Sequence, residues 1–183
     1  MWPDGGPDGT LTTGRRGCHH GRVSTARPEG LLSNGFELVE DTGEVTASLD
    51  GSFWSGEGTV VVDGREWSME RRFRGGVELL DGDQVVASAR RQGFLSARWS
   101  VAYDDRVLTL AKAGLFGRTY SVDAEPGGSV GEVRPNGMFS RGAAVTLPPD
   151  MPAHIQVLVV ALVMAEWRRS SSAASSAGAG STG

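Results

Sequence analysis

The most restrictive feature of this 183-residue sequence is a short apolar segment near its C-terminus. Between residues 155 and 165 the only polar side chain is Gln156. Asp150 and Pro152 precede this run in the order that is typical of a helix start, an acidic N-cap followed by proline in the first turn. We therefore expect a helix over residues 150–169. A helix that is apolar on every face must be enclosed by protein or by lipid.

The length of the run favours enclosure by protein. It has 11 residues, whereas a helix that crosses a bilayer needs about 20 consecutive apolar residues. A small tail-anchored membrane protein that uses residues 155–167 remains an alternative. A helix with its side chains is about 10 Å across, and an eight-stranded barrel is filled by its own side chains. Enclosing the helix therefore requires a wider barrel.

The rest of the chain contains a series of hairpin signals that would supply such a barrel. They are Asp50-Gly51, Asp63-Gly64, Asp81-Gly82, Asp104-Asp105, Pro126-Gly127-Gly128 and Asn136-Gly137. Asp-Gly and Asn-Gly pairs readily adopt the positive φ that tight hairpins require. The expected strands cover residues 36–40, 44–49, 58–63, 65–73, 77–80, 84–92, 94–103, 106–113, 118–124, 129–134 and 138–147. We predict a mainly β fold, a closed antiparallel barrel of about 11–12 strands around the C-terminal helix.

Composition divides the chain into one domain and two flanking segments. Residues 1–33 are rich in Gly, Pro, Thr and Arg without a hydrophobic period, so we expect a disordered arm, and translation that starts near Val23 or Leu32. Residues 34–169 form the domain. Residues 170–183 are almost entirely Ser, Ala and Gly and predict a flexible tail. The first ten residues do not resemble a secretory signal, which favours the cytoplasm.

Charge and residue content argue against several classes of function. Residues 34–169 hold 14 basic and 19 acidic residues, a formal net charge of −5, which is unsuitable for a general nucleic-acid binder. Cys18 is the only cysteine, and no second group of ligands follows Cys18, His19 and His20, so we expect no metal and no cofactor. The histidines offer no Ser-His-Asp set, and no carboxylate pair stands out. We expect a non-enzymatic protein.

Arginines on three consecutive expected strands are the best candidates for ligand binding. The candidate residues, which could bind an anionic headgroup, are Arg71, Arg72, Arg74, Arg91 and Arg98. Strand alternation places Arg71 and Arg91 on otherwise apolar faces, which makes them the strongest candidates. The alternative is that Arg72, Arg74 and Arg98 point outward and form weak surface ion pairs with nearby acids.

Three further expectations concern burial. Alternation predicts that Trp67, Met69 and Phe73 share the inward face of one strand. The amide of Gln156, inside the barrel, should bond to the surrounding strands. The sequence from Glu166 to Arg169 should emerge at the end of the barrel.

The serial hairpins and the closing segment LPPDMPAHIQVLVVALVMAEWRR together resemble the tubby C-terminal-like superfamily, especially its LURP-one-related and phospholipid-scramblase-like branches. The resemblance covers roughly residues 34–169 and rests on architecture. It implies a closed barrel of twelve strands around the terminal helix. Tubby proteins bind phosphoinositides through a basic pocket, and the scramblase relatives associate with membranes through added segments.

These observations together predict a binding or scaffold module that contacts anionic phospholipid headgroups or a protein partner. Its expected location is cytoplasmic and peripheral to the membrane. A lipocalin-like carrier of small molecules is a further alternative, because lipocalins also combine a barrel with a late helix. Their helix packs outside the barrel and needs a polar face, which this one lacks through its middle.

Overall fold

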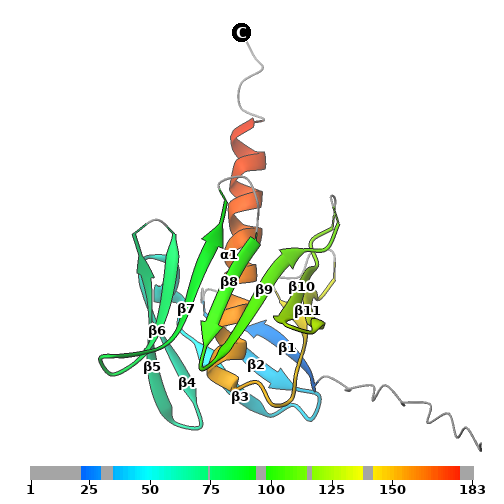
Figure 1. Ribbon diagram of the computed structural model, residues 1–183. Helices are drawn as coiled ribbons and strands as arrows, with labels where there is room; N and C mark the ends of the chain where they lie inside the picture. The colour runs from blue at the N-terminus through cyan, green and yellow to red at the C-terminus, as the bar shows by residue number, and fades with distance from the viewer. Residues whose placement is uncertain are drawn as a thin grey trace, which may run out of the picture.

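The computed structural model describes residues 22–29, 35–73, 75–93, 98–114, 117–137 and 142–177, which form a closed antiparallel barrel around a long helix (Figure 1). The elements are β1 (Arg22–Pro28), β2 (Phe36–Glu40), β3 (Val45–Leu49), the 3-10 helix η1 (Gly51–Trp54), β4 (Glu57–Val62), β5 (Arg65–Arg72), β6 (Gly76–Asp81), β7 (Gln84–Gln92), β8 (Arg98–Tyr103), β9 (Arg106–Lys112), β10 (Tyr120–Glu125), β11 (Gly128–Pro135), β12 (Ala143–Leu147) and α1 (Ala153–Ala177). Twelve strands enclose the helix, so the predicted fold class is confirmed.

The barrel is closed by a strand that the sequence analysis missed. β1 pairs with β12 on one side and with β2 on the other. The expectation of a disordered arm over residues 1–33 is therefore wrong for residues 22–28. Among residues 23–28, whose side chains are described, only Ser24 and Ala26 are buried, so this part of the strand has almost no hydrophobic pattern, and backbone pairing on both sides holds it in place. A chain that started at Leu32 would lack it.

The barrel has two ends, which we name by the direction of α1. At the helix-start end lie the turns β2–β3, β4–β5, β6–β7, β8–β9 and β10–β11, together with the connection from β12 to α1. At the helix-exit end lie the other connections. The tight turns at the helix-start end include Asp63 and Gly64, with φ of 50° and 76°, and Asp104 with φ of 46°. These turns use the positive φ that the Asp-Gly and Asp-Asp pairs predicted.

The helix runs through the barrel lumen. Every side chain from Ile155 to Met164 is buried, and large inward side chains such as Phe36, Met69 and Trp99 surround it. The helix packs closest against β3, β4 and β12. Within the part of the chain that is described, no helix is long and apolar enough to cross a membrane.

The observed helix differs from the expected one at both termini. It begins at Ala153 rather than residue 150, with the carbonyl of Pro152 accepting bonds from the backbone N–H groups of Ile155 at 2.9 Å and Gln156 at 3.1 Å. Asp150 is therefore not the N-cap. The helix continues to Ala177, so the expectation of a flexible tail is wrong for residues 170–177.

Two polar side chains near the helix start make local contacts. Nε2 of the buried Gln156 donates to the carbonyl of Met151 at 2.8 Å, in the turn before the helix. Its amide thus bonds to the chain that leads into its own helix, and the prediction of bonds to the strands is wrong. The ring of His154 stacks on Trp67 with 4.8 Å between centroids, and burial lowers the pKa of this histidine.

The alternation predicted for β5 holds only to the end of the strand. Trp67 and Met69 face the lumen as expected. Phe73 does not, because β5 ends at Arg72 and Phe73 lies in the turn that follows. Its side chain is 93% exposed, which makes it a large apolar group on the surface of the helix-exit end.

Candidate anion-binding site

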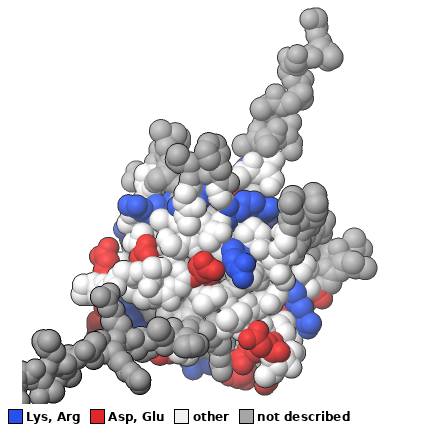
Figure 2. Space-filling view, turned by 90° about the vertical axis from the view of Figure 1, so that its right-hand side faces the viewer, with Lys and Arg blue, Asp and Glu red and all other residues white. Residues whose placement is uncertain are grey.

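The two ends of the barrel differ in their balance of charge. The described basic residues toward the helix-exit end are Arg27, Arg71, Arg72, Arg90, Arg91, Arg98, Lys112, Arg118, Arg134, Arg168 and Arg169, and they outnumber the acids of that end, which include Glu29, Glu37, Asp50, Glu57, Glu70, Glu78 and Glu166. Acidic residues of the helix-start end are Glu40, Asp41, Glu44, Asp63, Asp81, Asp83, Asp104, Asp105, Glu125 and Asp150. Figure 2 shows a row of basic side chains close to the emerging helix and a group of acidic ones toward the opposite end. The acidic net charge of the domain therefore conceals a basic end.

The strand register brings most of the predicted site residues together. β5 ends with Arg71 and Arg72, β7 carries Arg91 near its end, and β8 begins with Arg98. β5 and β7 both pair with β6, and β7 pairs with β8, where Gln92 lies opposite Arg98. Arg74 lies outside the described residues.

Arg72 is the predicted candidate with the most acidic neighbours. Its guanidinium contacts Glu70 at 2.7 Å and Glu78 at 2.7 Å, and the hydrogen bond to Glu78 is the largest cause of its raised pKa. The surface pairing that was the alternative interpretation therefore describes Arg72 correctly. Arg90 and Arg98 are also exposed, and neither forms an ion pair with any residue that the structure describes.

Arg71 lies beside a tryptophan on the rim of the barrel. Its Nη1 donates to the carbonyl of Trp54 at 3.4 Å, although the side chain itself is exposed. The guanidinium of Arg168, from the helix, lies over the Trp54 ring at 4.1 Å from its centroid. The two arginines thus approach the same residue from β5 and from α1, which places positive charge around the point where the helix leaves the barrel.

The buried carboxylate of Glu166 joins the helix to β7 and β8 at this end of the barrel. Glu166, 3% exposed, accepts hydrogen bonds at Oε1 from Trp99 Nε1 at 3.0 Å and from Arg169 at 2.6 Å. Nε of Arg91 lies 3.4 Å from the same oxygen and forms an ion pair without hydrogen-bond geometry. The expectation that Glu166 emerges from the barrel is wrong, because its side chain turns toward β7 and β8. Burial and then the charge of Glu166 raise the pKa of Tyr120 to about 12.

The contacts of Glu166 limit how far the predicted candidate Arg91 can bind a ligand. Arg91 faces inward as alternation predicted, but its Nε forms an ion pair with the buried carboxylate of Glu166. Only the outer part of its guanidinium remains for a ligand, since the side chain is 29% exposed. Trp167 adds a second anchor, with Nε1 donating to the carbonyl of Arg118 at 2.8 Å. The helix is therefore fixed at its exit by polar contacts as well as by packing.

A surface depression of about 320 Å³ lies beside Phe73 at the helix-exit end. Arg72, Arg90 and Arg91 line it together with the small residues Gly76 and Ala89 and with Glu78, which pairs with Arg72. Sequence reasoning placed Phe73 in the core and so missed this combination of an exposed aromatic ring with arginines. The signal was present in the segment Arg-Arg-Phe-Arg-Gly-Gly at residues 71–76, where two successive glycines indicate a turn close to Phe73.

No metal centre accompanies this site within the described ranges. Those residues hold no group of three or more His, Cys, Asp or Glu side chains that could bind a metal ion. Cys18, His19 and His20 lie outside them. No family model, curated protein or solved structure matches this chain.

Proposed function

We propose that this protein is a non-catalytic binding module whose helix-exit end contacts the anionic headgroups of a membrane. The observation that carries the proposal is the position of Phe73, which is 93% exposed at the tip of the β5–β6 hairpin beside an arginine-lined depression. The depression would accept a phosphate-bearing headgroup, and the aromatic ring would enter the interface beside it.

Each part of this arrangement contributes a known component of membrane binding. Arginine binds phosphate through two parallel N–H groups, and exposed arginines near an anionic surface contribute about 1 kcal/mol each. An exposed aromatic ring contributes apolar area that lies stably at the level of the headgroups. Because Arg90 and Arg98 make no ion pair with any described residue, they are the arginines with most to gain from a phosphate partner.

The resemblance to the tubby-like superfamily supports the same proposal. A barrel that encloses its terminal helix is the architecture which that resemblance implied, and a basic surface on the barrel suits an anionic lipid. The proposal places the protein on the cytoplasmic face of a membrane as a peripheral component. A protein partner with an acidic surface is the other ligand that this end would suit.

Flotation with lipid vesicles tests the proposal. We expect the full-length protein to float with vesicles of phosphatidylcholine and phosphatidylserine at low salt, and not with phosphatidylcholine alone. High salt should release it, since exposed charges are screened. The double variant Arg90→Ser and Arg98→Ser should lose most binding, and Phe73→Ser should lose binding with less change in salt sensitivity.

The matched control for the single variant Arg90→Ser is Arg65→Ser, which also removes one exposed arginine but at the helix-start end, where Arg65 pairs with Asp81. This variant should float like the unaltered protein. Equal loss of flotation in Arg65→Ser would show that net charge alone drives binding. Failure of the unaltered protein to float at low salt would rule out the lipid version of the proposal.

A further inference from the structure

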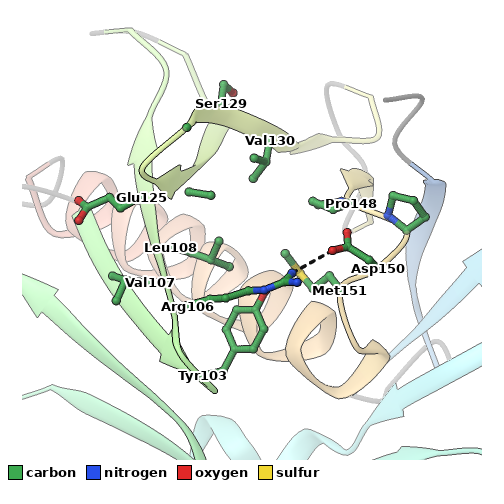
Figure 3. A pocket seen from close by; sticks show the side chains of 13 residues that line it. Tyr103, Arg106, Val107, Leu108, Glu125, Ser129, Val130, Pro148, Asp150 and Met151 are labelled. Carbon is green, nitrogen blue, oxygen red and sulfur yellow. Dashed lines mark hydrogen bonds and ion pairs between the residues drawn. The ribbon is translucent and has the colours of Figure 1, made fainter. Parts of the chain in front are cut away.

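A second and larger cavity opens at the opposite, helix-start end of the barrel. It has a volume of about 660 Å³, within the range of about 300–1,000 Å³ that is usual for small-molecule sites. Tyr103 of β8, residues of β9, β10 and β11, and the connection before α1 line it. Figure 3 shows these elements surrounding the opening, with the first turn of the helix at one side.

The cavity exists because the helix does not fill this side of the lumen. α1 packs closest against β3, β4 and β12, while the cavity lies along β9, β10 and β11. Three of the residues that line it on β10, β11 and the turn between them are small, namely Ala124, Gly127 and Ser129. Position and residue size therefore combine to leave a gap at this mouth of the barrel.

The interior of the cavity is apolar. Leu108 and Met151 form buried parts of the lining, and Val107 and Val130 add partly exposed apolar surface. Figure 3 shows Leu108 and Val130 directed into the space between the strands. An occupant with an apolar body would remove this surface from water, which is the main source of affinity in such sites.

The polar groups of the cavity are acidic overall. Its one basic lining residue among the described residues is Arg106, whose Nη1 contacts Asp150 at 2.9 Å. This hydrogen bond, followed by one to Tyr103, raises the pKa of Arg106. The ion pair with Asp150 balances the charge of Arg106 and uses one of the two lining carboxylates. Glu125 remains on the lining, and Asp104 and Asp105 lie in the adjoining β8–β9 turn. The resulting negative potential attracts cations and repels anions.

We propose that this cavity binds a small amphipathic cation, an aliphatic or aromatic amine with its apolar body against Leu108 and Val130 and its ammonium group at the edge of the cavity that carries Glu125, across from the Arg106–Asp150 pair (Figure 3). The volume accommodates one such molecule. This site is independent of the lipid-binding end, because it uses none of the arginines of the helix-exit end.

Fluorescence titration of the full-length protein with dansylcadaverine tests the site. This probe joins an aromatic body to a primary ammonium group, and its emission should rise and shift to shorter wavelength in a saturable manner. Dansyl-aminocaproic acid, with the same body and a carboxylate, should bind at least about tenfold more weakly because of the acidic surroundings. Equal or tighter binding of the acid, or no saturable signal from the amine, would overturn the proposal.

Two variants and a control locate the probe. Val130→Trp should abolish the amine signal by filling the cavity. Glu125→Gln, an exposed position, should weaken amine binding by about threefold or more even if Val130→Trp does not fold. Asp41→Asn removes one acid from the same end but outside the cavity, in the β2–β3 turn, and should change binding less than either. Unchanged amine binding in Glu125→Gln and in a folded Val130→Trp would disprove the assignment.

Discussion

The two ends of the barrel each contain an arginine–carboxylate contact, but in different surroundings. At the helix-exit end, Glu166 is almost completely buried and accepts bonds from a tryptophan and an arginine. At the helix-start end, Asp150 and Arg106 form their pair with side chains that are 62% and 57% exposed. Burial makes the first contact part of the fold, while solvent leaves the second available for exchange with a ligand. Similar chemistry therefore fixes one end and leaves the other adaptable.

The largest effect should come from a change that disturbs both ends together. Deleting residues 1–31 removes β1, the strand that runs between them, and leaves β2 and β12 each with an unpaired edge. We expect loss of cooperative thermal unfolding and aggregation at moderate concentration, measured by calorimetry and light scattering. Deleting residues 1–21 keeps every described strand and serves as the control. Cooperative melting of the shorter chain at the original temperature would show that β1 is dispensable.

The next largest effect should be a difference in stability between variants of the buried Glu166 and of the exposed Asp150. Glu166→Ala leaves Arg91 and Arg169 close together at the barrel end without their acid, and we expect a loss of about 3 kcal/mol in the free energy of unfolding. Asp150→Ala breaks an exposed pair and should cost at most about 1 kcal/mol. Urea denaturation measures both. If the two variants lost the same stability, burial would not be what distinguishes the ends.

Two glycine-to-alanine substitutions, one at each end, should lower stability for different reasons. A Cβ at Gly58, near the helix-exit end, would lie 2.5 Å from Cβ of Phe53, so Gly58→Ala should cost about 2 kcal/mol through overpacking. Gly64, in a turn at the helix-start end, has open space around it but a φ of 76°. Gly64→Ala should therefore cost about 1 kcal/mol through backbone strain alone. A greater loss for Gly64→Ala in the same denaturation assay would contradict this order.

The smallest effect concerns the pH dependence of the helix-start end. Burial lowers the pKa of His154 below its value of about 6.5 in the unfolded chain, so folding favours the neutral ring. Its contribution to stability is therefore complete above about pH 6.5 and is lost as the pH falls through the lower pKa of the folded state. The difference in melting temperature between about pH 7 and pH 5 should shrink in His154→Gln. No change in that difference would exclude His154 as a source of acid sensitivity.

The fold was predictable because its main features are local or depend on one strong pattern. The apolar run at residues 155–165 required an enclosure of a certain width, and the Asp-Gly pairs marked the hairpins that build it. β1 was not predictable from hydrophobicity, because residues 23–28 present only Ser24 and Ala26 to the core and the strand depends on pairing with β12, far away in the sequence.

The candidate site was less predictable because its geometry depends on where strands end. Alternation assigned Arg91 to the inward face correctly. It also assumed that β5 extends beyond Arg72, and so it placed Phe73 in the core. The burial of Glu166 depends on Trp99 and Arg91, which come from a distant part of the sequence. A helical spacing of three residues between Glu166 and Arg169 was the only local indication of that network.

The position of the helix after all the described strands has a consequence for the order of folding. The twelve strands precede α1 in the sequence, and the first pairs with the last. During synthesis the inner face of the sheet therefore has no partner until α1 has been made, and closure depends on strands that are far apart in the sequence. We expect slow folding of the domain that is completed only once α1 has left the ribosome, with a dependence on chaperones that a protein with an early core would not share.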